Sequence, residues 1–277
     1  MTYNDYSDRQ SREGTSERIL IMGKLQATLI SNAGILLEYE NTKILVDAIY
    51  DDEGHDFSGI PHKTWEMMLS GQDPFQSIDY LLFTHNHPDH FSERRLKEFL
   101  MNRKVKGVFL PEEAVDGNEL SSFLEERNVP AVILGSQTDH QVFSLDSGLE
   151  LQTVRMQHLK PLEKKYRDVS NFCYLLKLEQ MKVLITADVD YVHHDFREIP
   201  QEWDVVFLNP YFFGEMEYRH FYYGALRSKA FAVYHVPFRG DDRMNMRHML
   251  QQRLERWNED GGIVKAFTEP MQTEWFV

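Results

Sequence analysis

Three histidines and one aspartate fall within six residues of the chain, and side chains of these kinds bind metal ions. They are His85, His87, Asp89 and His90. His85 and His87 are two residues apart, so in an extended backbone both imidazoles point to the same side. Pro88 prevents a helix at this point and favours an extended backbone just before it. Because neutral imidazole and carboxylate suit zinc and similar divalent metals, the string predicts a metal site, whereas a lone His-x-His is more typical of a polar surface turn.

The segments on either side place this string at the end of a strand. Residues 78–83 form a short, mostly apolar run, which predicts a buried strand. Residues 92–100 predict a helix that has Ser92 as its N-cap. In open α/β sheets ligands bind beyond the carboxyl ends of the strands, so we expect the histidines to face a binding site.

The string from His85 to His90 resembles the HxHxDH signature of the metallo-β-lactamase superfamily. The resemblance implies a fold of class α/β, a four-layer αββα sandwich with two metal ions between its sheets. It also implies three later ligands, and the candidates His158, Asp188 and His235 each end an apolar run. The implied ligands are His85, His87 and His158 for one metal, Asp89, His90 and His235 for the other, and Asp188 as the bridge between both.

Some of these assignments have rivals. Asp190 is the rival for the bridging position, His140 for the third ligand of the first metal, and His220 for the last histidine. His140 precedes a predicted strand, whereas the ligands follow strands. His220 lies in an aromatic run of the kind that forms a core or a pocket wall. His193 and His194 follow the bridging position closely, and we expect them at the surface.

The opening strands resemble one branch of the superfamily, typified by the ascorbate-6-phosphate lactonase. Residues 25–30 predict a strand, and residues 35–40 and 43–47 predict a hairpin. In that branch a Gly-His-Ser/Ala step often precedes the second strand. Here Asn32 occupies the place of the histidine, which is a departure from the pattern of the branch.

The resemblance implies a dinuclear metal-dependent hydrolase that acts on a small anionic ester, phosphoester or lactone. Bridged divalent ions generate hydroxide near neutral pH and stabilise the attacking and leaving oxygens, and Asp89 would transfer the proton. We expect two divalent ions, zinc or manganese, with iron left open because such sites accept several metals. His87 stands where the diiron electron-transfer branch has Glu, which disfavours redox iron chemistry. The alternatives are a phosphodiesterase or RNA-processing nuclease, and a non-catalytic metal-binding sensor, which the complete ligand set argues against.

Four residues are candidates for contacting the substrate. They are Lys160, Arg239, Asn209 and Tyr211. Two divalent ions bring four positive charges, and Asp89, Asp188 and a hydroxide return three, so the site would be about one charge positive. Lys160 and Arg239 follow ligands and could bind a phosphate or carboxylate, although both could equally be solvated surface charges. Asn209 and Tyr211 follow another strand and are expected to line the pocket.

Composition restricts the class of partner. The 277-residue chain has a net charge of −14, which argues against nucleic acid, because binding to nucleic acid relies on Lys and Arg to neutralise phosphates. The single cysteine, Cys173, excludes an internal disulfide and suits a reducing compartment. No apolar run approaches the length that spans a bilayer. We therefore expect a cytoplasmic enzyme with a small substrate and no membrane association, and the sequence leaves its oligomeric state open.

The sequence predicts one folded domain. Residues 1–18 are polar and lack the apolar core of a signal peptide, so they predict a flexible leader. Residues 19–277 contain no evident linker and predict a single metallo-β-lactamase-like domain. The long connection at 51–77 predicts a lid, with a short helix around residues 65–69 lying over the site. The alternative is a surface excursion that packs on its own side chains.

Overall fold

The computed structural model describes residues 23–135, 139–159, 169–191, 196, 199–200, 202–213, 226–258 and 263–277. The predicted leader lies outside these residues. Within them, the strands form two seven-stranded sheets. The first sheet contains, in spatial order, β14 (Thr273–Phe276), β1 (Leu25–Leu29), β2 (Ile35–Tyr39), β3 (Thr42–Val46), β4 (Tyr80–Leu82), β5 (Gly107–Pro111) and β6 (Ala131–Leu134). The second contains β13 (Ile263–Ala266), β12 (Arg227–Val233), β11 (Glu202–Leu208), β10 (Met181–Ile185), β9 (Ser170–Leu178), β8 (Glu150–Gln157) and β7 (His140–Ser144).

Each sheet is antiparallel in one half and parallel in the other. In the first sheet β14, β1, β2 and β3 pair antiparallel, and β3 to β6 pair parallel. In the second sheet β7 to β10 pair antiparallel, and β10 to β13 pair parallel. The hairpin predicted at residues 35–47 is present, with Tyr39 opposite Thr42. Parallel strands end at the same edge, so the loops after β4, β10 and β12 can meet.

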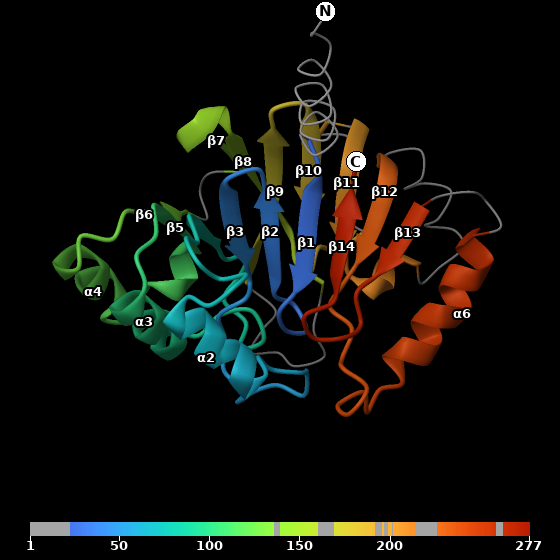
Figure 1. The fold of residues 1–277 in the computed structure, drawn as a ribbon, viewed down its shortest axis with the longest axis horizontal. Coiled ribbons are helices and arrows are strands. Elements are labelled where there is room, and N and C mark those ends of the chain that lie inside the picture. The colour runs from blue at the N-terminus through green and yellow to red at the C-terminus, as the bar shows by residue number, and fades with distance from the viewer. Residues whose placement is uncertain are drawn as a thin grey trace, which may run out of the picture.

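Three apolar cores explain the layers. One core lies between the sheets and includes Leu37 and Leu82 from the first sheet and Tyr174 and Phe207 from the second. A second core packs the first sheet against helices α2 (His62–Ser70), α3 (Glu93–Asn102) and α4 (Leu120–Glu126). A third packs the second sheet against the short helix η5 (Pro210–Phe213) and helix α6 (Met246–Asn258). Helices α2 to α4 and helix α6 accordingly lie at opposite sides of the molecule (Figure 1).

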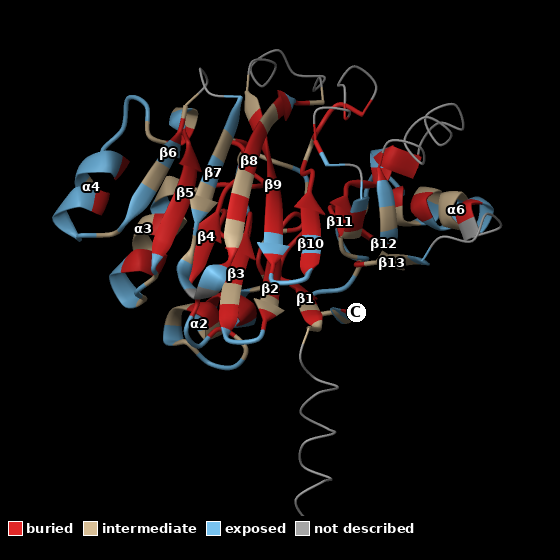
Figure 2. Cartoon of the chain, turned by 90° about the horizontal axis from the view of Figure 1, so that it is seen from above, coloured by how far each residue is buried: buried red, intermediate tan, exposed pale blue. Residues whose placement is uncertain are grey.

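This arrangement confirms the predicted four-layer αββα sandwich. The central strands are buried over most of their length, whereas the edge strands β6, β7, β13 and β14 and the outer helices expose more of their surface (Figure 2). The structure also contains the short helices η1 (Glu112–Ala114) and η2 (Asp146–Gly148). The predicted N-cap of α3 is present, because the backbone N–H of Arg95 donates to Ser92 Oγ at 3.2 Å.

The helix in the long connection forms, but our prediction of what it covers is wrong. Trp65 and Met68 of α2 are buried in the core on the outer face of the first sheet, together with Phe99 of α3. Its apolar side chains therefore stabilise the outer layer and do not lie over the histidines. Helix formation was predictable from the apolar spacing, whereas the choice of face depends on tertiary packing.

Candidate metal centre

The histidine string lies on a buried loop directly after β4. His85 and His90 are fully buried, and His87 and Asp89 are 6% exposed. The backbone N–H groups of His90 and Phe91 both donate to the carbonyl of His87, so the chain turns sharply here and brings Asp89 and His90 back toward the first two histidines. The local fold therefore gathers four metal-binding side chains on one loop.

The three remaining candidates come from the second sheet. His158 follows β8, Asp188 follows β10, and His235 follows β12. Their ligand atoms join the loop in three groups, within each of which the atoms lie less than 4.8 Å apart. The groups are His85, His87 and His158; His85, His90 and Asp188; and Asp89, His90 and His235. Strand ends from both sheets thus bring the seven predicted ligands together in one place.

The distances place Asp188 between two sets of ligands. Asp188 Oδ2 lies 3.5 Å from His90 Nε2, 3.5 Å from His235 Nε2 and 3.8 Å from His158 Nε2. Within the sets, His158 Nε2 lies 3.3 Å from His85 Nε2, and His90 Nε2 lies 3.1 Å from His235 Nε2. Ring nitrogens that face one another this closely, with a carboxylate oxygen between the pairs, have the chemistry and spacing of ligands around two divalent cations.

The protonation states of two histidines of the first set and of both aspartates suit metal binding. Burial lowers the pKa of His85 far below its ordinary value and lowers that of His87 to about 4, so both imidazoles are neutral and offer a lone pair. Burial would raise the pKa of Asp89, but the neighbouring His90 and His235 lower it to about 2. Burial also opposes ionisation of Asp188, yet His235 and His90 hold its pKa well below the usual range. Both aspartates are therefore charged.

In the second set, neighbouring carboxylates favour the protonated histidines. Burial would lower the pKa of His90, but Asp89 and Asp47 raise it well above its ordinary value. Burial likewise opposes protonation of His235, and Asp188 raises its pKa. A cation that binds here replaces protons, because a histidine must be neutral to act as a ligand.

Asp47 orients two of the ligands, although our sequence analysis gave it no role. His90 Nδ1 lies 3.0 Å from Asp47 Oδ2. Thr84 donates its hydroxyl to Asp47 Oδ2 at 2.6 Å, and the same hydroxyl lies 2.9 Å from His85 Nδ1. Both Nδ1 atoms thus donate protons to oxygens and leave Nε2 free for a metal. The available signal was that Asp47 ends the predicted strand at residues 43–47; it lies directly after β3, the parallel neighbour of β4.

Comparison with known proteins decides the family. A family model described as "Beta-lactamase superfamily domain" matches residues 42–262. The chain belongs to this superfamily. It is accordingly a metal-dependent hydrolase. The three groups of histidine and aspartate side chains described above could hold its metal ions. No curated protein matches the chain.

Solved structures share the superfamily fold at low sequence identity. Igni18, a metallo hydrolase from Ignicoccus hospitalis, is 15% identical with a TM-score of 0.60, covering 92% of this chain and 99% of that one. CmlA, a diiron β-hydroxylase from Streptomyces venezuelae, is 17% identical with a TM-score of 0.59, covering 91% of this chain and 53% of that one, so this chain spans about half the length of CmlA. The short form of human tRNase Z is 13% identical with a TM-score of 0.55, covering 90% and 98%. These likenesses show the fold alone.

The superfamily ligand set is favoured over two of its rivals. His140 is exposed and lies 3.1 Å from Gln152 Oε1, in a strand and not at the centre. Asp190 is buried but belongs to none of the three ligand groups among the described residues. The other rival, His220, and the neighbours His193 and His194 lie outside the described residues.

The predicted substrate residues have different surroundings. Asn209 Nδ2 donates to the carbonyl of Ala187 at 2.9 Å, and its Oδ1 accepts from the N–H of Tyr211 at 3.1 Å. Asn209 therefore supports the turn that carries Asp188. Tyr211 is half-exposed, and its hydroxyl has a pKa raised by burial and by the charge of Asp188. Arg239 is exposed and lines a cavity of about 640 Å³ beside α6. Lys160 lies outside the described residues.

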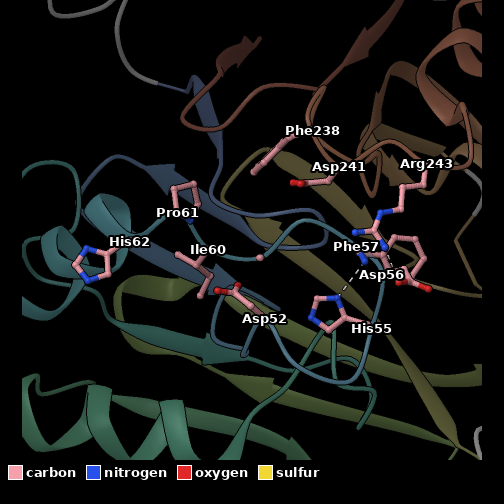
Figure 3. A pocket seen from close by; sticks show the side chains of 11 residues that line it. Asp52, His55, Asp56, Phe57, Ile60, Pro61, His62, Phe238, Asp241 and Arg243 are labelled. Carbon is pink, nitrogen blue, oxygen red and sulfur yellow. Dashed lines mark hydrogen bonds and ion pairs between the residues drawn. The ribbon is translucent and has the colours of Figure 1, made fainter.

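A separate pocket of about 430 Å³ adjoins the centre. Figure 3 shows the side chains that line it. One wall is the connection before α2, and the other is the loop after His235. The lining residues are Asp52, His55, Asp56, Phe57, Gly59, Ile60, Pro61, His62, Phe238, Asp241 and Arg243. The ring of Phe57 meets the ring of His235 edge-on, with centroids 4.9 Å apart, so this pocket lies next to the second set of ligands.

No helix in the described part of the chain is long and apolar enough to cross a membrane.

Proposed function

We propose that this chain hydrolyses a small anionic ester, phosphoester or lactone at a dinuclear centre. The observation that carries the proposal is the position of Asp188 Oδ2, 3.5 Å from His90 Nε2 and 3.8 Å from His158 Nε2. One carboxylate oxygen thus faces the ligands of both sets, as a bridge must. Two bound divalent ions would activate water and stabilise the reacting oxygens.

The side chains of the centre have separate tasks. His85, His87 and His158 form one ligand set, and the second set is Asp89, His90 and His235. Asp89 is charged and 6% exposed, so it can accept a proton from the attacking water and return it to the leaving group. Tyr211 is half-exposed, and burial and the charge of Asp188 raise the pKa of its hydroxyl, which supports a contact with the substrate.

The pocket beside the centre would bind the part of the substrate that does not react. Its walls combine the apolar surfaces of Phe57 and Phe238 with three aspartates and one arginine. Asp52 and Asp241 make no side-chain hydrogen bond or ion pair with another described residue, and Asp56 pairs only with Arg243, at 3.5 Å. The pocket is therefore net negative. A substrate would place its anionic group on the metals and an apolar or hydrogen-bond-donating end in the pocket.

Zinc or manganese is our proposal for the metal, since mixed imidazole and carboxylate ligands accept both. Iron stays an alternative, because CmlA, with the same fold, is described as a diiron enzyme.

Among the branches of the superfamily, the ascorbate-6-phosphate lactonase branch fits the opening strands best, with Asn32 as the departure from its pattern. We further propose a cytoplasmic location from the single cysteine and a single domain over residues 19–277.

A substrate panel tests the proposal. The protein, loaded with Zn²⁺ or Mn²⁺, is assayed against bis-p-nitrophenyl phosphate, small phosphoesters, a set of lactones and a precursor-type RNA. Metal-dependent turnover of a small ester or lactone supports the proposal. Turnover of the RNA alone would favour a nuclease, despite the net charge of −14. Metal binding without any turnover would favour the sensor.

A further inference from the structure

Asn32 fixes the position of the last metal ligand. It lies in the turn between β1 and β2 and is fully buried. Its carbonyl accepts the backbone N–H of His235 at 2.9 Å, and its side-chain amide lies 2.9 Å from His235 Nδ1. His235 has a φ of +62°, a left-handed conformation that residues with a side chain rarely adopt. The two contacts therefore hold both the unusual backbone and the ring of this ligand.

The orientation of the Asn32 amide matters for the chemistry of the ring. With Nδ2 toward His235, Nδ1 must accept, which puts the ring proton on Nε2. In that orientation Asn32 Oδ1 is buried without a partner among the described residues. A half-turn of the amide exchanges its nearly isosteric oxygen and nitrogen, so that Oδ1 accepts from Nδ1–H. The oxygen is then satisfied, Nδ2 takes the place where Oδ1 had no partner, and Nε2 presents a lone pair 3.3 Å from Asp89 Oδ2.

We propose that Asn32 is a positioning residue for the second metal ion, because its amide oxygen accepts from His235 Nδ1–H and directs the Nε2 lone pair into the second ligand set. This inference rests on the proposed dinuclear function. The other ligands obtain the same orientation from different residues: His90 from Asp47, and His85 from the hydroxyl of Thr84. Loss of the Asn32 side-chain amide should therefore weaken binding of the second metal ion and leave binding of the first unchanged.

Asn32 also connects the centre to the neighbouring pocket. Its backbone N–H donates to the carbonyl of Ser58 at 3.2 Å, and Ser58 Oγ accepts the N–H of Phe238 at 2.7 Å. Neither contact uses the side-chain amide of Asn32. A substitution of the side chain alone thus tests the contact with His235 without removing the bonds that fasten the pocket walls.

The test is a titration of the metal-free protein with Zn²⁺ against a competing chelator. Wild type is compared with Asn32→Leu, which keeps the size but has no acceptor, and with Asn32→Asp, which keeps an oxygen acceptor. We expect Asn32→Leu to bind the first ion as wild type does and the second about 10–100-fold more weakly, the usual cost of losing such a partner. Asn32→Asp should bind the second ion at least as tightly as wild type.

The outcomes separate this inference from the function on which it rests. If wild type binds two ions and Asn32→Leu binds both with unchanged affinity, or loses affinity equally at both, the inference is overturned while the dinuclear function stands. If leucine prevents folding, the nitrogen-15 spectrum of Zn²⁺-loaded wild type decides: a proton on His235 Nδ1 supports the inference, and a proton on Nε2 refutes it. Wild type that binds fewer than two ions refutes both.

Discussion

The metal centre and the pocket beside it are built in opposite ways. At the centre, His85 and His90 are fully buried and Asp47 orients both, one of them through a threonine hydroxyl. In the pocket, Asp52, Asp241 and Arg243 are exposed and have few or no partners among the described residues. The centre is fixed by strand ends and buried hydrogen bonds, whereas the pocket is made by two loops. We infer that the centre determines the reaction and that the pocket selects the substrate, so changes in the two regions should affect different kinetic constants.

The largest expected effect comes from removing the bridge. Asp188→Ala should lower kcat by more than about 100-fold, because even an outer partner of a ligand costs about 10–100-fold. The fold should survive, since the core between the sheets does not depend on this side chain. Activity and the thermal unfolding midpoint are measured together. Unchanged turnover would mean that another group, such as Asp190, forms the bridge.

The next effect isolates proton transfer. Asp89→Asn keeps the size of the side chain but removes its charge, and general acid–base catalysis contributes about 10²–10⁴-fold. We expect kcat to fall within that range, with KM little changed. Metal content is determined on the same sample. A variant that retains both its ions and full activity would refute the role of Asp89 in proton transfer.

Replacing Asp47 tests whether a residue that orients the ligands, without being one of them, affects metal affinity. Asp47→Asn removes the charge that faces His90 and leaves one acceptor oxygen where Asp47 has two, for the Thr84 N–H, the Thr84 hydroxyl and His90 Nδ1. We expect metal affinity to fall about 10–100-fold. The matched control is Asp79→Asn, a buried aspartate outside the three ligand groups that accepts from the N–H of Lys43. Equal metal affinity in wild type and Asp47→Asn would contradict the account of the centre.

The smallest expected effect lies in the pocket. Asp52→Asn and Asp241→Asn should change KM by several-fold, about the 1 kcal/mol of one exposed interaction, and leave kcat unchanged. A Cβ at Gly59 would lie 1.5 Å from Asp52 Oδ1, so Gly59→Ala should displace that carboxylate and have the same effect. Arg239→Ala, in the other cavity, is the comparison for the predicted anion contact. A fall in kcat alone would mean that the pocket participates in the reaction and not in selection.

The candidate ligands could be identified from the sequence because short stretches of residues carry the signal. His85, His87, Asp89 and His90 lie on one loop, and His158, Asp188 and His235 each follow an apolar strand, so their types and positions are readable without the fold. The tautomer of a ligand is not readable in this way. It depends on Asn32, which lies 203 residues from His235 in sequence and meets it only when the two sheets pack.

The shape of the pocket could not be predicted for a related physical reason, although the connection at 51–77, which we predict as a lid, supplies one of its walls. Loops take their shape from the surfaces on which they pack, and apolar spacing says only that a helix has one buried face. The spacing around Trp65 predicted a helix, but the outer core decided that it covers the first sheet. Phe57 and Phe238 come together because Ser58 accepts the N–H of Phe238 across 180 residues of sequence.

The metal content of the purified protein tests the central claim most directly. The chain is stripped of metal, reconstituted with Zn²⁺ or Mn²⁺, freed of excess ion and subjected to elemental analysis. The account predicts about two divalent ions per chain, because the ligand atoms form two sets that share the oxygen of Asp188. A protein that is folded and binds fewer than two ions after reconstitution would contradict it.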